Sequence, residues 1–271
     1  MGPRRAQILT ARTADKHDLY QRSVQSASED ASFLARRFRA MAGRPLRSFR
    51  EDFCGTALLC CEMVRLHPEN HALGIDLHGP TLRWARSHNL SRLREGERLR
   101  VDLMQRDVLS VRSPRVDLVA ALNFSYWVFR SRPEMRAYFR NARRSLVPGG
   151  ALVIDVYGGG NAQKVLVERT RLRGFDYVWD QAAFDPITHR ILCRIHYEFP
   201  DGSRMRNAFT YRWRLWTLPE LREMMDEAGF RDVHVLWEGT DRKRNVGNEV
   251  YRRSRRGTAD PAWIAYLIGR A

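Results

Sequence analysis

The strongest constraint on the fold is a regular alternation of short apolar segments with longer amphipathic ones between residues 46 and 157. The short segments are rich in apolar residues and several end in an acid, and most are followed by a segment with helical spacing. Strands that alternate with helices form a parallel sheet covered by helices on both faces. The sequence therefore predicts a doubly wound α/β fold.

The individual elements follow from the same patterns. One or two helices are expected over residues 15–41, ended by Gly43 and Pro45. Strands are expected at residues 46–53, 71–77, 98–107, 115–122 and 151–157, and helices at 57–66, 80–88 and 134–146. Residues 147–150 (VPGG) are expected to form a turn. A helix at 219–228 and strands at 231–239 and 262–269 complete this α/β core.

The segment after Tyr157 has a different texture. A polar helix is predicted over residues 161–172, followed by three long stretches at 175–185, 189–199 and 204–216. The turn residues Pro200 to Ser203 predict that the last two stretches form a hairpin. Residues 240–261 are basic and are expected to be a loop. We therefore predict a helical lid at residues 1–45 and a core at 46–271, with an antiparallel β insert after strand five at about 160–216.

The chain is strongly basic, with 271 residues, a formal net charge of +16 and a pI of about 10.6. Clustered cations bind the phosphates of nucleic acids without sequence preference. However, 44 of the 47 basic residues are arginine, and they are scattered through every segment. Solvated faces are the simpler explanation of this distribution, and an acidic partner stays open as the less favoured alternative.

The four cysteines, Cys54, Cys60, Cys61 and Cys193, form no C-x-x-C pair and have no accompanying histidine cluster. This pattern indicates neither a disulfide framework nor a metal site.

The first 18 residues contain no apolar stretch of signal-peptide length, and no apolar run approaches the roughly 18 residues of a membrane span. A cytoplasmic protein is expected.

Polar residues gather at the expected carboxyl ends of the strands, where doubly wound sheets bind ligands. The small-residue stretch from Glu51 to Ala57 follows strand one, and its turn lets backbone N–H groups approach a ligand closely. Asp76 ends strand two, where it could accept both hydroxyls of a ribose. Asp107 ends strand three, and residues 123–127 (NFSYW) follow strand four. Together these positions predict a pocket for a nucleoside.

At these positions the chain resembles the class I S-adenosylmethionine-dependent methyltransferases. The stretch EDFCGTA is similar to their acidic, glycine-rich loop, and ALGIDL to their ribose-binding strand end. QRDV, VDLVAALNFSYW and SLVPGGALVIDV match the three following motifs in order, so the resemblance spans residues 47–155. It implies a Rossmann-like sheet of seven strands and S-adenosyl-L-methionine as cofactor. The β insert and helical N-terminus also look like those of the small-molecule branch.

The resemblance also assigns residues. Glu51 matches the acid that supports the methionine end of the cofactor, although Asp52 could exchange roles with it. Phe53 and Ala57 stand where the family usually has glycine, which puts the loop geometry in question. The expected cofactor-binding residues are Tyr20, Glu51, Phe53, Cys54, Gly55, Asp76, Leu77, Asp107, Val108 and Asn123.

Asn123 and Tyr126 are predicted to face the substrate as catalytic residues, with Trp127 as an aromatic wall. Tyr20 and Tyr157 could close over the donor, and His78 is a candidate base. Simpler interpretations remain beside these. Gly55 could only turn the chain, Asp76 could cap the next helix, Asp107 could be one of several acids beside the strands, and the aromatic residues could be core.

The arginines of the insert alternate with apolar residues, so one face of its sheet is expected to display Arg190, Arg194, Arg204, Arg206, Arg212 and Arg214. If that face overlooks the pocket, an anionic small-molecule acceptor is expected, because arginine pairs bidentately with carboxylates and phosphates.

The predicted function is methyl transfer to a nitrogen or oxygen of a small molecule. An RNA or protein methyltransferase, a nicotinamide-dependent oxidoreductase and a scaffold without activity are the alternatives.

Overall fold

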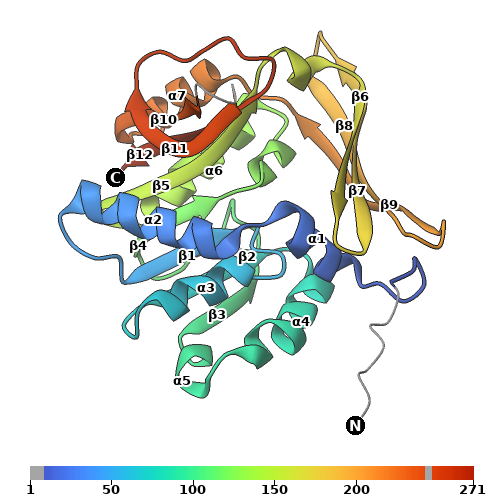
Figure 1. Ribbon diagram of the computed structural model, residues 1–271. Coiled ribbons are helices and arrows are strands. Elements are labelled where there is room, and N and C mark those ends of the chain that lie inside the picture. The colour runs from blue at the N-terminus through green and yellow to red at the C-terminus, as the bar shows by residue number, and fades with distance from the viewer. Residues whose placement is uncertain (1–8, 242–245) are drawn as a thin grey trace. The chain divides into compact units, whose positions relative to one another are not determined.

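The computed structural model describes residues 9–241 and 246–271. These residues fall into two compact units (Figure 1). Of the described residues, the small unit contains 9–25 and 163–215, and the large unit contains 26–162, 216–241 and 246–271. Each unit contains its own β-sheet.

The large unit is built on a sheet with the strand order β11-β10-β12-β5-β4-β1-β2-β3. β1 to β5 run parallel, and β10, β11 and β12 are joined antiparallel. The doubly wound prediction is confirmed, but the sheet has eight strands and not seven. The strands are β1 (Ser48–Asp52), β2 (His71–Asp76), β3 (Val101–Gln105), β4 (Val116–Ala121), β5 (Leu146–Gly158), β10 (Arg231–Asp241), β11 (Val246–Ser254) and β12 (Trp263–Arg270).

The eighth strand is β11, which lies in the basic segment that we expected to be a loop. It pairs only with β10 and forms one edge of the sheet. Charged side chains are common on edge strands because they prevent pairing with other molecules. The arginines that made this segment look like a loop are therefore compatible with a strand at the edge.

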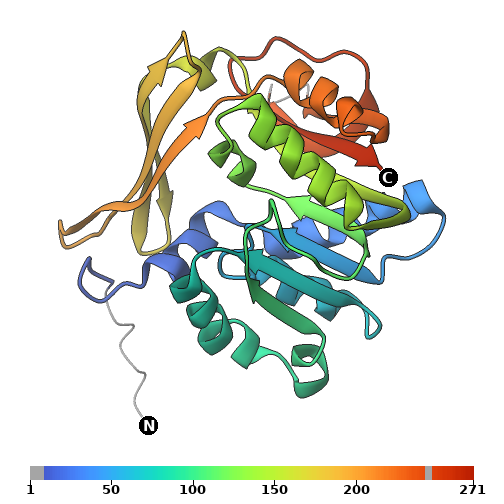
Figure 2. The same cartoon turned by 180° about the vertical axis from the view of Figure 1, so that it is seen from behind.

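Helices cover both faces of the large sheet (Figures 1 and 2). One face carries α2 (Ala27–Ala42), α3 (Leu58–Leu66) and α4 (Gly79–His88), whose apolar residues join a common buried cluster. The other carries α6 (Arg132–Arg144) and α7 (Leu218–Glu227), each opened by a capping box and a proline in its first turn. Gly43 ends α2 in the left-handed conformation, as expected. The short helices are α5 (Glu95–Arg98), η1 (Leu90–Arg92), η2 (Ser125–Val128) and η3 (Gly160–Gln163).

The predicted turn at VPGG lies inside β5, at a shift of register. β5 pairs with β4 through Leu146 and again from Ala151, so residues 147–150 bulge out between the two contacts. Gly149 in this bulge has a φ of 76°. Because β5 pairs with β4 on both sides of the bulge, this strand is longer than the apolar run at residues 151–157.

The small unit contains an antiparallel sheet with the order β6-β7-β8-β9 and the helix α1 (Lys16–Val24). The strands are β6 (Leu166–Leu172), β7 (Phe175–Asp185), β8 (Arg190–Glu198) and β9 (Arg204–Arg214). The predicted hairpin of β8 and β9 is confirmed. The polar helix predicted at 161–172 is wrong, because β6 occupies most of this range as an edge strand. Leu19 of α1 packs with Phe175, Ile195, Tyr197 and Phe199 in the buried cluster of this unit.

Candidate functional site

The loop between β1 and α3 has left-handed backbone at alternate residues. Phe53, Gly55 and Ala57 have φ values of 59°, 50° and 54°. These are the three positions at which the methyltransferase pattern usually has glycine. Two of the three carry a side chain, which costs roughly 1–2 kcal/mol per residue in this conformation. The loop backbone therefore turns in the way the glycine pattern requires, although two of its glycines are absent.

Two interactions tie this loop to the end of β2. The Cys54 N–H donates to the carbonyl oxygen of Ile75 at 2.9 Å. The Gly55 N–H donates to Oδ2 of Asp76 at 2.8 Å, and the other oxygen of Asp76 accepts the N–H of His78 at 2.7 Å. The structure thus brings the predicted glycine and the predicted ribose ligand into direct contact. Leu77, beside them, is 65% exposed.

The two acids at the end of β1 point to opposite faces of the sheet. Asp52 is completely buried and is held by a 2.7 Å ion pair with Arg50 and by the Tyr138 hydroxyl at 3.1 Å. Glu51 is also buried, but it has no cationic partner among the described residues. The Cys60 thiol donates to its Oε2 at 3.2 Å. Burial, with a smaller contribution from the nearby Asp76 carboxylate, raises the pKa of Glu51 to about 8.

Two more acids belong to the same electrostatic group. Burial raises the pKa of Asp30, on α2, to about 6, and that of Asp155, on β5, to about 7. The charge of Asp30 also raises the pKa values of both Glu51 and Asp155. No lysine or arginine neutralises Glu51 or Asp155 by an ion pair within the described part of the chain. A bound cation would therefore lower the cost of ionising these carboxylates.

The residues after β4 form a second left-handed turn. Asn123 and Phe124 have φ values of 56° and 55°, and their N–H groups donate to the two oxygens of Asp155 at 2.7 and 3.0 Å. Tyr126 is fully buried and its hydroxyl donates to the Asp155 carbonyl oxygen at 2.7 Å. Trp127 is buried as well. Of the three predicted catalytic residues, only Asn123 is partly exposed, and its side-chain amide makes no hydrogen bond to another described side chain.

The remaining predicted residues of the large unit have local structural contacts. Oδ1 of Asp107 accepts the Leu109 N–H at 2.9 Å and shapes the turn after β3. Val108 is buried, and its carbonyl oxygen accepts a hydrogen bond from Asn141 at 2.7 Å. Nδ1 of His78 lies 2.7 Å from the Thr81 hydroxyl and caps α4. His78 thus has the structural role that the sequence offered beside its role as a base.

Tyr20 lies in the small unit, where its ring packs 5.0 Å from that of Phe209. Its predicted role in closing over the donor stays a prediction. Tyr157 lies 5.9 Å from Phe124 by ring centroids.

Sequence reasoning missed Asp30 and Asp155. The second could have been found, because an aspartate in the middle of the apolar run ALVIDVY needs a polar partner.

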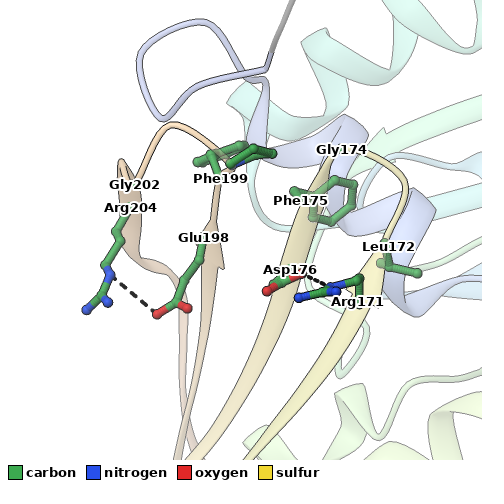
Figure 3. Close-up of a pocket in the computed structure, with 10 residues that line it drawn as sticks. Arg171, Leu172, Gly174, Phe175, Asp176, Glu198, Phe199, Gly202 and Arg204 are labelled. Atoms are coloured by element: carbon green, nitrogen blue, oxygen red, sulfur yellow. Dashed lines mark ion pairs between the residues drawn. The ribbon is translucent and has the colours of Figure 1, made fainter.

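A separate pocket of about 360 Å³ lies in the small unit, at the end of the sheet that carries two hairpin turns (Figure 3). Phe175 and Phe199 lie in its wall, and the charged residues at its rim are already paired. Arg171 pairs with Asp176 at 3.7 Å, and Arg204 pairs with Glu198 at 3.5 Å. The pocket contains none of the predicted cofactor residues, so we do not place the chemistry there.

Residues 53–150 match the family model of a methyltransferase domain. No curated protein matches the chain. Among solved structures, an S-adenosylmethionine-dependent methyltransferase from Clostridium acetobutylicum is 13% identical and has a TM-score of 0.69, with 94% of this chain and 96% of that chain covered. A sugar N-methyltransferase from a Streptoalloteichus species is 18% identical with a TM-score of 0.64, covering 100% and 96%. An amino pentose methyltransferase from Micromonospora echinaspora, solved with its methyl donor bound, is 18% identical with a TM-score of 0.65, covering 94% and 96%.

The sheet order, the acidic loop after β1 and the matched domain define a class I methyltransferase fold. Residues 53–150 form a methyltransferase domain by this match, and the fold of the chain is that of S-adenosylmethionine-dependent methyltransferases. The resemblance seen in the sequence is thereby confirmed. Among the described helices, none is both long and apolar enough to cross a membrane.

Proposed function

We propose that this enzyme transfers a methyl group from S-adenosylmethionine to an amine of a small molecule. The observation that carries the proposal is Glu51, a buried carboxylate without a cationic partner among the described residues, at the end of β1. S-adenosylmethionine bears a sulfonium and an ammonium group, so its methionine end supplies the positive charge that this acid lacks. Asp52 is less suited to this role, because Arg50 and Tyr138 already occupy it.

The nucleoside end of the cofactor fits the neighbouring residues. Each oxygen of Asp76 accepts one backbone N–H, which leaves further lone pairs for two ribose hydroxyls. The exposed Leu77 provides an apolar surface beside them. We assign adenine to the turn at Asp107 and Val108, as the resemblance implies. These assignments share one edge of the sheet, the carboxyl ends of β1, β2 and β3.

The sulfonium supplies an activated methyl group, so the protein mainly has to align the acceptor and exclude water. The amine lone pair attacks the methyl carbon, the carbon–sulfur bond breaks with its electron pair going to sulfur, and the amine proton leaves to solvent. We assign Asn123 to orient the acceptor, because its side-chain amide makes no hydrogen bond to another described side chain. Trp127 and Tyr126 are buried and support this turn from within.

An amine acceptor is supported by two lines of reasoning. The acids Asp30, Glu51 and Asp155 favour positively charged groups near the donor. In addition, the similar solved structures include a sugar N-methyltransferase and glycopeptide N-methyltransferases. An acceptor that also bears an anionic group, as predicted from the insert arginines, stays a prediction.

Calorimetry with S-adenosylmethionine, its demethylated product and reduced nicotinamide dinucleotide tests the cofactor. We expect binding of the first two only, and binding of the nicotinamide alone would contradict the proposal. Transfer of a labelled methyl group to matched pairs of small molecules, one with an amine and one with a hydroxyl at the same carbon, tests the acceptor. Methylation of the hydroxyl partners alone would exclude the amine assignment.

One observation favours an RNA methyltransferase as the second candidate. The register of β8 and β9 puts arginines on one face of the small sheet, opposite Ile191, Cys193 and Ile195. Several are already paired with acids, for example Arg194 with Asp180 at 3.5 Å. Copurification with RNA that salt and nuclease abolish, and that Arg206→Glu with Arg212→Glu weakens, would favour this candidate.

A further inference from the structure

Asp155 occupies a special place between β5 and the turn after β4. The parallel ladder of these strands ends at the pair Ala121 and Ile154, so Asp155 is the next residue along β5. Beyond this pair the chain of β4 leaves the sheet. The Asp155 carboxylate then replaces the missing backbone acceptors, with one oxygen for the Asn123 N–H and the other for the Phe124 N–H. The side chain thus extends the pairing by two residues.

The turn that Asp155 holds is intrinsically unfavourable. Asn123 and Phe124 are consecutive residues with left-handed backbone, a conformation that aromatic residues adopt rarely. Such a conformation persists only when the surrounding structure compensates for it. Two hydrogen bonds from N–H groups to a carboxylate are a strong compensation, because bonds to a charged acceptor are stronger than bonds between neutral groups.

Both oxygens of Asp155 are already engaged, and its side chain is only 8% exposed. A carboxylate in this situation is poorly placed to take a proton from a substrate. Its carbonyl oxygen also accepts the Tyr126 hydroxyl, so three groups of one turn bind to a single residue. These contacts indicate that Asp155 shapes the turn. The same turn carries the Asn123 side chain, which we assign to orient the acceptor.

We propose that Asp155 is a positioning residue for methyl transfer, which fixes Asn123 at the carboxyl end of β4 by binding the N–H groups of Asn123 and Phe124. This inference rests on the proposed function, because it takes the role of Asn123 from there. The clamp itself is a property of the fold and can be measured without any ligand.

The two bonds are strongest with an ionised carboxylate, because a charged acceptor binds N–H groups more strongly than a neutral one. Burial, with a smaller contribution from the charge of Asp30 on α2, raises the pKa of Asp155 to about 7. Burial, and to a smaller extent the charge of Asp155, raises the pKa values of Tyr126 in the same turn, Tyr266 of β12 and Tyr251 of β11. Because the pKa of Asp155 is raised in the folded state, the stability that this group contributes is lost as the pH rises through about 7.

Hydrogen exchange of the Asn123 and Phe124 amides in the full chain, without ligand, tests the clamp. Asp155→Asn should reduce the protection of both amides about tenfold or more, as expected for losing a hydrogen bond to a charged acceptor. Asp102→Asn, on the exposed side of β3, should leave both amides unchanged. If Asp155→Asn does not fold, the wild-type chain still gives the answer at a single pH, because both amides should be better protected than the amide of Ser125, whose hydrogen bond to the Leu122 carbonyl oxygen is 3.4 Å long. Protection of both amides that does not depend on Asp155, or that is no greater than that of Ser125, would overturn the clamp.

Affinity for S-adenosylmethionine separates positioning from simple support of the fold. In Asp155→Asn we expect affinity to fall about tenfold at pH 8 and to vary less between pH 6 and pH 8 than in the wild type. In a chain that already carries Phe124→Gly, Asp155→Asn should lower the affinity for S-adenosylmethionine less, because glycine adopts the left-handed backbone without strain. Wild-type affinity and pH dependence in Asp155→Asn would leave the residue a purely structural role. If the wild type binds no S-adenosylmethionine, the proposed function fails, while the exchange experiment still reports on the clamp.

Discussion

The carboxylate of Asp76 accepts the backbone N–H of Gly55 at 2.8 Å, so the acid at the end of β2 holds the loop that follows β1. The same carboxylate binds the N–H of His78, at the start of α4. One side chain therefore fixes two of the segments that we assign to the cofactor. Removing it should affect the shape of the site as well as the contact with ribose.

Asp76→Ala should weaken S-adenosylmethionine binding by roughly 1.5–3 kcal/mol, the range for charge-assisted hydrogen bonds. It should also lower the free energy of unfolding by about 1–3 kcal/mol, because two backbone donors lose their acceptor. Calorimetry and denaturant unfolding measure the two effects. Asp102→Ala, an exposed acid on the adjacent strand β3, serves as the control and should change neither. Unchanged affinity in Asp76→Ala would remove the ribose assignment.

Glu51 and Asp52 should respond in opposite ways to loss of their charge. Asp52→Asn breaks a fully buried ion pair and leaves Arg50 unpaired, which should cost about 3–5 kcal/mol of stability. Glu51→Gln removes a buried charge that has no cationic partner among the described residues. Its stability at about pH 8 should equal or exceed that of the wild type, while its affinity for S-adenosylmethionine falls.

Unfolding curves and calorimetry on the two variants decide which acid serves the cofactor. The matched comparison is informative because the residues are adjacent and differ in their partners. Weaker binding in folded Asp52→Asn, together with normal binding in Glu51→Gln, would exchange the two roles.

The sequence predicted the core of the fold because its strands and helices bury apolar residues with clear periodicity. All six residues of β4 are buried, for example, and every one of them except Asp117 is apolar. The two errors concern edge strands. β6 and β11 lie at the edges of their sheets and are rich in charged residues, so their composition resembles that of a polar helix or a loop. Pairing with a neighbour, which local composition does not reveal, makes them strands.

The site was predictable where spacing alone determines position. Gly55 and Asp76 follow strands that are neighbours in a parallel sheet, and they are found in contact. The orientation of single side chains was not predictable. Tyr126 reads as an exposed polar residue after β4, but its hydroxyl finds a buried acceptor on β5, 29 residues later in the chain. Such pairings depend on the packed structure and leave no local pattern.

Binding of S-adenosylmethionine should strengthen as the pH rises from about 6 to about 8. Burial raises the pKa values of Glu51 and Asp155 to about 8 and about 7, so the folded state without ligand holds protons that the unfolded chain releases. Stability contributed by these groups is therefore lost as the pH rises through this window. A bound cation favours the ionised forms, so the cofactor should displace protons.

Calorimetry in buffers with different ionisation enthalpies counts the protons released. We expect a net release of protons near pH 7. The release should be smaller in Glu51→Gln, because this substitution removes the carboxyl group that would lose its proton. Binding that releases no protons at this pH would mean that the buried acids do not face the positive charge of the cofactor.

The two side chains in the glycine-like loop should differ in what they contribute. Ala57→Gly relieves left-handed strain of roughly 1–2 kcal/mol, but it adds chain entropy to the unfolded state and removes a buried methyl group. Its stability should therefore stay within about 1 kcal/mol of the wild type. Phe53→Gly relieves similar strain but removes a ring that packs against Phe129 and Tyr138, with centroids at 5.8 and 5.9 Å, so a net loss of about 1–3 kcal/mol is expected. Denaturant unfolding of both variants measures the difference. If Phe53→Gly were as stable as Ala57→Gly, the ring would contribute little to folding, and a contact with the cofactor would be the remaining reason for an aromatic residue in a left-handed turn.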